Sequence, residues 1–262
     1  PFVPGGLKSS AQTKSSEYTK SVVPKAQCGP GERAESGLQG QTTSAERFSS
    51  AGAQPVNCNL ELVGKFDSDG AKMDFTTLDS CGYLSVGVVP GQAHRGIAVV
   101  DASNRGRLQT TTYLDSQAML NPNESLEAHA GRKLLVGVEN TPKGPAAFDV
   151  YDIADCRHPA LKASLAVTGF KGHAGRFTSD GRTYYGTSGT YNDPYVNEDG
   201  FIAVDVSDPA HPKVIHRWRA PKEVPPHDIS ISADGTRAYI GILGHPLRVQ
   251  TDVHREANGM AI

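Results

Sequence analysis

The sequence predicts an all-β fold, a β-propeller of four-stranded antiparallel blades, and three observations support this prediction. Two different sequence signatures recur along the chain with one shared spacing of about 50 residues. The 262 residues include 28 glycines and 17 prolines, a density that suits short strands joined by turns. A helical repeat of this length would need long segments with a 3.6-residue period, and the sequence contains none.

Charge and hydropathy exclude several classes of protein. There are 26 Lys and Arg against 28 Asp and Glu, without a basic stripe, so we expect neither nucleic acid nor an anionic membrane as partner. The longest apolar stretches, such as 96–100, have about five residues, whereas a membrane span needs about twenty. No signal peptide or lipidation motif is visible, and because residue 1 is Pro rather than Met, we expect a processed or incomplete start.

Residues 1–57 differ in composition from the rest of the chain. They are rich in Ser, Thr, Gln, Gly and Ala and contain few bulky apolar residues. Such a segment buries too little surface to offset its ordering entropy, so we expect an extended or partly disordered N-terminal arm. Short β-type runs begin after it, and the first of them, 58–66, is expected to be a closing strand.

The first signature is an apolar strand that ends in Asp and is followed by a Pro-flanked turn. It is complete at 201–212, Phe-Ile-Ala-Val-Asp-Val-Ser-Asp-Pro-Ala-His-Pro, and recurs at 148–159 and more weakly at 96–104. The strand-ending residues Asp101, Asp152 and Asp205 are 51 and 53 residues apart.

The second signature is a polar residue at the start of a strand that leads to an Asp-Gly turn. It begins at His227 and His173, and degraded copies end in turns at Gly131 and Gly82. Gly accepts positive φ without steric cost, so Asp-Gly suits a hairpin. Four strands per repeat, here called A to D from the inside outward, give blades at 73–113, 123–167, 173–219 and 227–262, the last incomplete.

About four blades are therefore visible, and two arrangements are consistent with them. The chain is either a four-bladed ring clasped by the strand 58–66 or the front part of a larger ring of up to seven blades. We favour the larger ring, because the chain stops only a few residues into the last strand C.

These motifs resemble the LVIVD-repeat proteins, which are bacterial propellers that are usually exported. The resemblance rests on the apolar-Asp run with its Ser-Asp-Pro-x-His-Pro turn, on Gly-Leu-Gln-Gly-Gln at 37–41, and on Cys-Asn-Leu-Glu-Leu-Val-Gly at 58–64. It covers roughly residues 28–262 and implies a fold rather than a reaction, since the family as a whole has no assigned activity. Its members are typically longer than this chain.

Strand direction places the variable loops on one face of the predicted propeller. The D–A and B–C connections open together there, opposite the short Asp-Gly and Pro-x-His-Pro turns, and long loops on a rigid scaffold are common binding sites. Tyr191 and Tyr195 lie in one of these loops and are candidate ligand contacts.

A ring of polar residues is expected at the start of the inner strands. Eight residues before each turn Gly, the four repeats carry Asp74, Asn123, His173 and His227. These side chains either cap the preceding loop and line the channel, contact a polar ligand, or hold a divalent metal ion through His173 and His227, since imidazole binds Zn, Cu or Fe.

The four cysteines form no Cys-x-x-Cys pair, which argues against a zinc or redox site. Cys81 is expected in the A–B turn of the first blade and Cys156 in the C–D turn of the second, both on the short-turn face of neighbouring blades. We therefore expect disulfides Cys81–Cys156 and Cys28–Cys58, the second tying the arm to the propeller. Two disulfides imply an extracytoplasmic location: periplasmic, cell-surface or secreted.

No nucleophile, Walker or dinucleotide motif occurs, so whether the chain is an enzyme stays open. The preferred hypothesis is an exported propeller that binds a protein partner or small ligand on its loop-bearing face without catalysis. The alternative is a metal-dependent hydrolase or oxidase with a His-lined axial site, and a third option is a purely structural repeat module.

Overall fold

The computed structural model describes most of the predicted blades and parts of the segment before them. The described residues are 27–32, 44–50, 57–67, 74–87, 90–140, 145–188, 200–220, 226–242 and 259–262. The chain divides into two compact units, Pro1–Leu62 and Val63–Ile262.

The first unit contains a short helix and a disulfide. Helix α1 spans Ser44–Arg47, and the disulfide joins Cys28 to Cys58. The exposed Glu32 carboxylate accepts hydrogen bonds from the backbone N–H of Asn59 and of Gly29, which lower its pKa. The Asn59 contact ties a residue next to Cys58 to a residue near Cys28.

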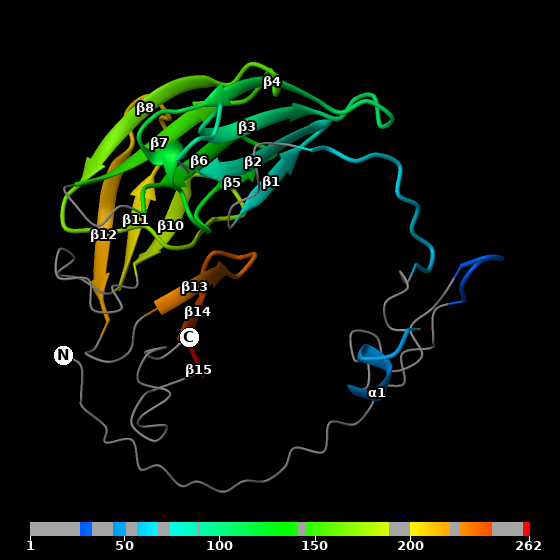
Figure 1. Cartoon of the computed structure of the whole chain (residues 1–262). Coiled ribbons are helices and arrows are strands. Elements are labelled where there is room, and N and C mark those ends of the chain that lie inside the picture. Colours follow the sequence, from blue (N-terminus) through cyan, green and yellow to red (C-terminus); the bar gives the residue numbers. More distant parts are fainter. Residues whose placement is uncertain are drawn as a thin grey trace, which may run out of the picture. The chain divides into compact units, whose positions relative to one another are not determined.

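The second unit is built from four antiparallel sheets, each a meander of consecutive strands (Figure 1). The first sheet contains β1 (Phe75–Leu78), β2 (Cys81–Gly87), β3 (Gly96–Asp101) and β4 (Gln109–Leu114). The second contains β5 (Glu127–His129), β6 (Leu134–Val138), β7 (Ala146–Asp152) and β8 (Ala160–Val167). The third contains β9 (Gly175–Phe177), β10 (Thr183–Ser188), β11 (Gly200–Asp205) and β12 (Lys213–Arg219). The fourth has β13 (Pro226–Ile231), β14 (Ala238–Ile242) and β15 (Gly259–Ala261) among the described residues.

The inner strands of successive sheets lie against one another. Strand β1 contacts β5, β5 contacts β9, and β9 contacts β13, whereas no such series links the outer strands β4, β8 and β12 in the described part of the chain. Strands β6 and β7 are almost entirely buried, while β8 and β12 alternate between exposed and half-buried residues. Four-stranded sheets packed through their inner strands are the architecture of a β-propeller, so the predicted fold class is confirmed.

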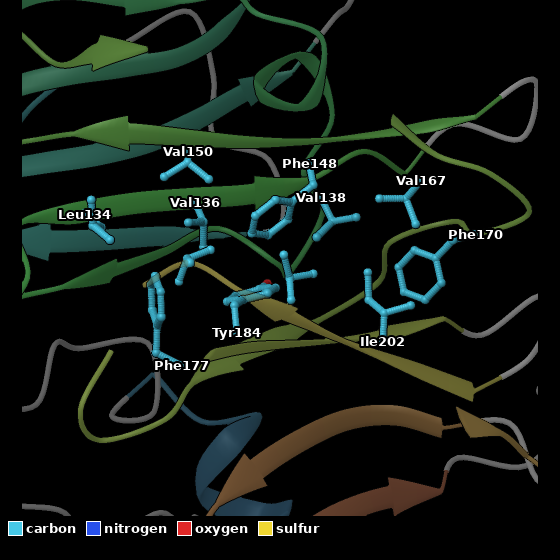
Figure 2. Packing of buried hydrophobic residues seen from close by; sticks show 12 residues of the cluster. Leu134, Val136, Val138, Phe148, Val150, Val167, Phe170, Phe177, Tyr184 and Ile202 are labelled. Carbon is cyan, nitrogen blue, oxygen red and sulfur yellow. The ribbon is translucent and has the colours of Figure 1, made fainter. Parts of the chain in front are cut away.

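The largest hydrophobic cluster lies between the second and third sheets. Figure 2 shows β-branched and aromatic side chains of the two sheets pointing toward one another. Phe148 and Tyr184 are fully buried at its centre, with ring centroids 5.4 Å apart. The Tyr184 hydroxyl donates a 2.7 Å hydrogen bond to the Ser125 carbonyl oxygen of the neighbouring blade. This buried aromatic side chain therefore has the polar partner that it needs across the interface.

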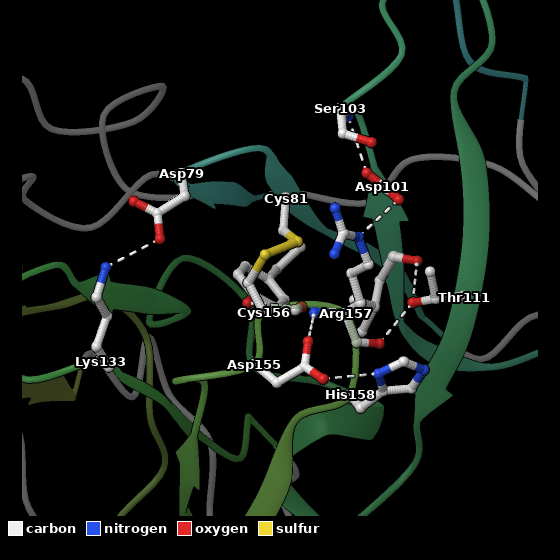
Figure 3. The surroundings of a disulfide bond; sticks show 12 residues. Asp79, Cys81, Asp101, Ser103, Thr111, Lys133, Asp155, Cys156, Arg157 and His158 are labelled. Carbon is white, nitrogen blue, oxygen red and sulfur yellow. Dashed lines mark hydrogen bonds and ion pairs between the residues drawn. A yellow bond between two sulfur atoms is a disulfide. The ribbon is translucent and has the colours of Figure 1, made fainter.

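A second cluster joins the first and second sheets, and a disulfide crosses the same interface. Cys81 begins β2, and its disulfide partner Cys156 lies in the turn between β7 and β8 (Figure 3). The Tyr83 hydroxyl donates to the Cys156 carbonyl oxygen at 3.0 Å. Arg157 Nε contacts Asp101 Oδ2 at 2.7 Å, so a covalent bond and an ion pair hold the two blades together. Both expected disulfides are thus present.

The hairpin turns follow the predicted pattern in two blades and shift in the other two. Gly181 and Gly235 have positive φ angles of 66° and 69°, as an Asp-Gly turn requires. In the first blade the positive φ belongs to Asp79, and Gly82 lies inside β2. In the second blade it belongs to Lys133 rather than Gly131. The expectation of a turn at Gly82 was therefore wrong, because Gly82 lies inside β2; Gly131 does lie in the turn between β5 and β6, although Lys133 is the left-handed residue there.

The segment 58–66, expected to be a closing strand, is not a strand in this structure. Its described residues form no extended ladder, and Leu60 and Leu62 are 76% and 84% exposed. Phe66 instead packs against the small cluster formed by Val86, Ala98 and Val100. Apolar alternation alone does not make a strand, since a strand also needs a hydrogen-bonding edge to pair with.

We predict that the Cys81–Cys156 disulfide stabilises the propeller, whereas Cys28–Cys58 does not. The first pair closes a separation of 75 residues across two blades. Its replacement by two serines should lower the free energy of unfolding by about 2–4 kcal/mol, because the unfolded chain gains freedom. Urea unfolding followed by fluorescence of the single Trp, Trp218, measures this.

The matched control is the double Ser variant of Cys28 and Cys58, both within the unit Pro1–Leu62. It should leave the Trp218 transition within about 0.5 kcal/mol of wild type, the range of changes remote from a packed core. Equal losses in the two double variants would contradict the assignment of the first disulfide to the blade interface.

We also predict that Tyr184→Phe destabilises the chain by about 1 kcal/mol, because it leaves the buried Ser125 carbonyl oxygen without its donor. Urea midpoints of the variant and of Tyr185→Phe provide the comparison. Tyr185 is on the same strand but half-buried, with its ring against Phe201, so its change should be smaller. An equal loss of stability in Tyr185→Phe would contradict the role of the Tyr184 hydroxyl at the blade interface.

Candidate functional site

The structure brings three of the four predicted ring positions into direct contact. Asn123 Nδ2 lies 3.0 Å from His173 Nδ1, and the rings of His173 and His227 meet edge to face with centroids 4.4 Å apart. Asn123 precedes β5, His173 precedes β9, and His227 is the second residue of β13. Three repeats therefore place polar side chains at one point, the start of the inner strands.

Asp74, the fourth position, lies directly before β1 and faces the same region. Its carboxylate is within electrostatic reach of Arg176, Glu124 and Asp228, and burial raises its pKa. The carboxylate also accepts a 2.8 Å hydrogen bond from the Phe75 N–H. The candidate contacts Tyr191 and Tyr195 lie outside the described residues.

Glu124 is the main site residue that the repeat pattern does not identify. Its Oε2 lies 3.6 Å from His173 Nε2 and 3.9 Å from His227 Nε2. The equivalent positions after the other ring residues are Phe75, Ala174 and Asp228, so this position shares no residue type among the repeats. The sequence gives one hint of its role: an acidic residue directly follows the ring position in two repeats, Glu124 after Asn123 and Asp228 after His227.

Hydrogen bonds within and between blades hold the main chain that carries these side chains. The Glu124 N–H donates to the His173 carbonyl oxygen, and the His173 N–H donates to the Thr187 carbonyl oxygen, both at 2.9 Å. The buried Thr187 hydroxyl donates to the His227 carbonyl oxygen at 2.8 Å. An isolated parallel bridge between Glu124 and Ala174 completes the connection. The site therefore rests on main-chain contacts rather than on flexible loops.

Further ionisable side chains extend this group along the inner strands. Arg176 Nη2 lies 3.6 Å from Asp228 Oδ2, and the Phe177 N–H donates to Glu127 Oε2 at 2.5 Å. Burial raises the pKa of Glu127 to about 7, with Asp74 and Asp228 adding repulsion. We call the following seven residues the inner cluster: Asp74, Glu124, Glu127, His173, Arg176, His227 and Asp228. It contains four carboxyl groups and one guanidinium.

The imidazole of His173 is held in its neutral form at neutral pH. Burial lowers its pKa, and the neighbouring imidazole of His227 lowers it further. Its side chain is 15% exposed, against 29% for Glu124 and 31% for His227. Glu124 and His227 are thus partly open to solvent, whereas the His173 Nε2 atom is buried.

This arrangement supports two kinds of chemistry. Two imidazoles and a carboxylate, whose ligand atoms all lie within 4.8 Å of one another, are a donor set for a divalent transition metal. The surplus of carboxyl groups also favours an organic cation, because a positive charge relieves their mutual repulsion.

Comparisons with known proteins assign no family and no activity. No family model matches the chain, and no curated protein matches it. A putative 6-phosphogluconolactonase from Bacteroides fragilis is similar in structure, with a TM-score of 0.49 and 16% identity, over 63% of this chain and 46% of that one. Hydrazine synthase from Kuenenia stuttgartiensis has a TM-score of 0.43 and 16% identity, over 62% and 47%.

The β-propeller domain of Cps50 (Swd1) from Myceliophteria thermophila has a TM-score of 0.42 and 13% identity, over 62% of this chain and 49% of that one. The chain thus spans less than half the length of each of these three structures. At this level of similarity they add no functional argument, and the site has to be interpreted from its own residues.

We predict that Glu127 makes the chain less stable as the pH rises from about 4.5 to about 7. In this interval the carboxyl ionises in the unfolded chain, with an ordinary pKa of 4.5, but stays protonated in the folded chain. The loss is at most about 3 kcal/mol. The lowered pKa of His173 acts in the opposite direction, so the effect is isolated by comparison with Glu127→Gln.

Urea unfolding of both proteins at pH 4.5, 6 and 8 provides this comparison. The variant should gain stability relative to wild type as the pH rises, because Gln keeps the acceptor for the Phe177 N–H but cannot ionise. A difference between the two proteins that stays constant over this range would show that Glu127 titrates normally.

Proposed function

We propose that this chain is an extracytoplasmic β-propeller of the LVIVD-repeat type that binds a small cationic ligand at the inner cluster. The observation that carries the proposal is the meeting of ionisable side chains from all four sheets at the start of the inner strands. The resemblance supports the family, through the repeated Ser-Asp-Pro-x-His-Pro turn.

The sign of the ligand follows from the charges of the cluster. Burial and mutual repulsion raise the pKa values of Asp74 and Glu127, so their ionised forms are disfavoured in the empty site. Arg176 is one cation among four carboxyl groups and already contacts Asp228. A bound cation would favour the ionised forms and gain the attraction of several carboxylates at once.

The topology supports access to this site. The connections between the second and third strands of each sheet leave from the end at which the inner strands begin, as the bond between the His173 N–H and the Thr187 carbonyl oxygen illustrates. Tyr191 and Tyr195 belong to the connection between β10 and β11, and we retain them as proposed ligand contacts.

The extracytoplasmic location is supported by both disulfides, which persist in oxidising compartments. No helix among the described residues is long and apolar enough to cross a bilayer.

A second candidate function, a metal-dependent hydrolase or oxidase, is favoured by one observation. Glu124, His173 and His227 form a three-ligand set of the kind that leaves a coordination position open for substrate or water. A protein partner on the loop-bearing face is the remaining alternative from the sequence.

Thermal shift measurements with charged probes test the proposed function. The probes are spermidine, choline, lysine methyl ester and a divalent metal ion. We expect at least one of these cations to raise the melting temperature of the chain. Phosphate and citrate should not, because the inner cluster carries excess negative charge. Titration calorimetry then gives the dissociation constant of the active probe.

The double variant Asp74→Asn, Asp228→Asn should weaken that probe about tenfold or more, since each lost charge removes over 1 kcal/mol at short range. Asn keeps the acceptors for the Phe75 and Ile229 N–H groups. Asp67→Asn, at an exposed ion pair with Lys65, is the matched control and should change affinity less than twofold. Failure of every cation to bind, or equal binding by all three proteins, would refute the proposal.

A further inference from the structure

We infer that Glu124, His173 and His227 form a mononuclear site for a divalent first-row transition metal ion, with zinc the best fit. This inference rests on the proposed function, because it specifies the cation that the inner cluster binds. Each ligand comes from a different blade: Glu124 precedes β5, His173 precedes β9, and His227 lies in β13.

The donor set selects the class of metal. Two imidazole nitrogens and one carboxylate oxygen suit Zn²⁺, Fe²⁺, Co²⁺ or Cu²⁺, whereas Ca²⁺ and Mg²⁺ prefer oxygen ligands throughout. A set of two His and one Glu is also among the known ligand combinations of zinc sites that keep one position open.

The distances fit an ion after small side-chain movements. Bond lengths of about 2.0–2.1 Å in a tetrahedral site place neighbouring ligand atoms about 3.3 Å apart. Glu124 Oε2 lies 3.6 Å from His173 Nε2 and 3.9 Å from His227 Nε2. These two pairs need contractions of about 0.3 and 0.6 Å, and all three ligand atoms lie within 4.8 Å of one another, so rotation of the side chains has to bring them together while hydrogen bonds hold the backbone of Glu124 and His173.

Asn123 supplies the outer contact that a metal-binding imidazole usually has. Coordination through His173 Nε2 requires the proton on Nδ1, where the Asn123 amide lies 3.0 Å away. In the structure the amide nitrogen Nδ2 faces Nδ1, so coordination through Nε2 requires the Asn123 amide to flip; its oxygen then accepts the Nδ1 proton and fixes the tautomer.

The three ligand side chains lie beside other ionisable groups of the inner cluster. Glu124 and His227 are 29% and 31% exposed, so water or a small anion could reach the site beside them, whereas His173 Nε2 is buried. Asp228 directly follows His227 and lies within electrostatic reach of His173, so it adds a further carboxyl group beside the three ligand residues. A second grouping of metal-ligand residue types, Cys28, Glu32 and Cys58, offers no thiolates because both sulfurs form a disulfide.

Titration of the EDTA-dialysed full chain with ZnCl₂ and CoCl₂ tests the inference. We expect one ion per chain by calorimetry, and visible d–d absorption of bound Co²⁺ typical of low coordination number. Asn123→Ala should weaken Zn²⁺ binding about 10- to 100-fold, as loss of an outer contact does. Glu124→Gln, His173→Ala and His227→Ala should each lose at least as much and alter the cobalt spectrum.

His216→Ala is the matched control, since His216 is exposed on the outer strand β12 and should leave both metals unaffected. Melting temperatures of the metal-free variants verify folding, and Glu124→Gln, nearly the same shape as Glu, keeps the test valid if a His variant unfolds. Absence of stoichiometric binding, or binding that survives all ligand substitutions, overturns the inference. If organic cations bind while neither metal does, the inference fails and the proposed function stands; if nothing binds, both fail.

Discussion

The structure depends on one constraint: each sheet can bury its apolar faces only against the neighbouring sheets. The contacts that meet this constraint are specific as well as apolar. The Tyr184 hydroxyl and the Thr187 hydroxyl each donate to a carbonyl oxygen of the adjacent blade, Ser125 and His227 respectively. Because backbone groups buried between sheets need such partners, the register of one blade fixes that of the next. The position of every inner-strand side chain follows from this.

The inner cluster is a consequence of the same packing. Inner strands that start at a common level bring their first residues together, whatever those residues are, and here they are ionisable. Glu127 nevertheless stays half-buried with its pKa raised to about 7 by desolvation, and desolvation also raises the pKa of Asp74. Carboxyl groups whose surroundings disfavour ionisation are typical of binding sites. In such a site the opposite charge that favours ionisation comes from the ligand rather than from the protein.

The sequence predicts the repeats, the fold and both disulfides, because these depend on spacing. Equal distances from the turn glycines also place Asn123, His173 and His227 at one level, and they do meet. Glu124 escapes this reasoning since its equivalents are Phe75, Ala174 and Asp228, so only the structure shows that its side chain reaches both imidazoles. The turns at Asp79 and Lys133 and the non-strand segment 58–66 escape it too, because local backbone geometry and edge pairing are not properties of spacing.

The histidines show why neighbours rather than residue counts identify a site. In the Pro-flanked turns, His158 Nδ1 lies 2.9 Å from Asp155 Oδ2 and His211 Nδ1 lies 2.8 Å from Asp208 Oδ2, each pair within its own turn. These imidazoles are satisfied by a residue three positions earlier, so they stabilise a turn and need no ligand. His173 and His227 instead face Glu124 from two other blades, an arrangement that no single repeat needs for its own folding. The contact of Glu124 with both imidazoles exists only between repeats, and no repeat needs it to fold. Such a contact is therefore the place where a function of the assembled propeller is expected.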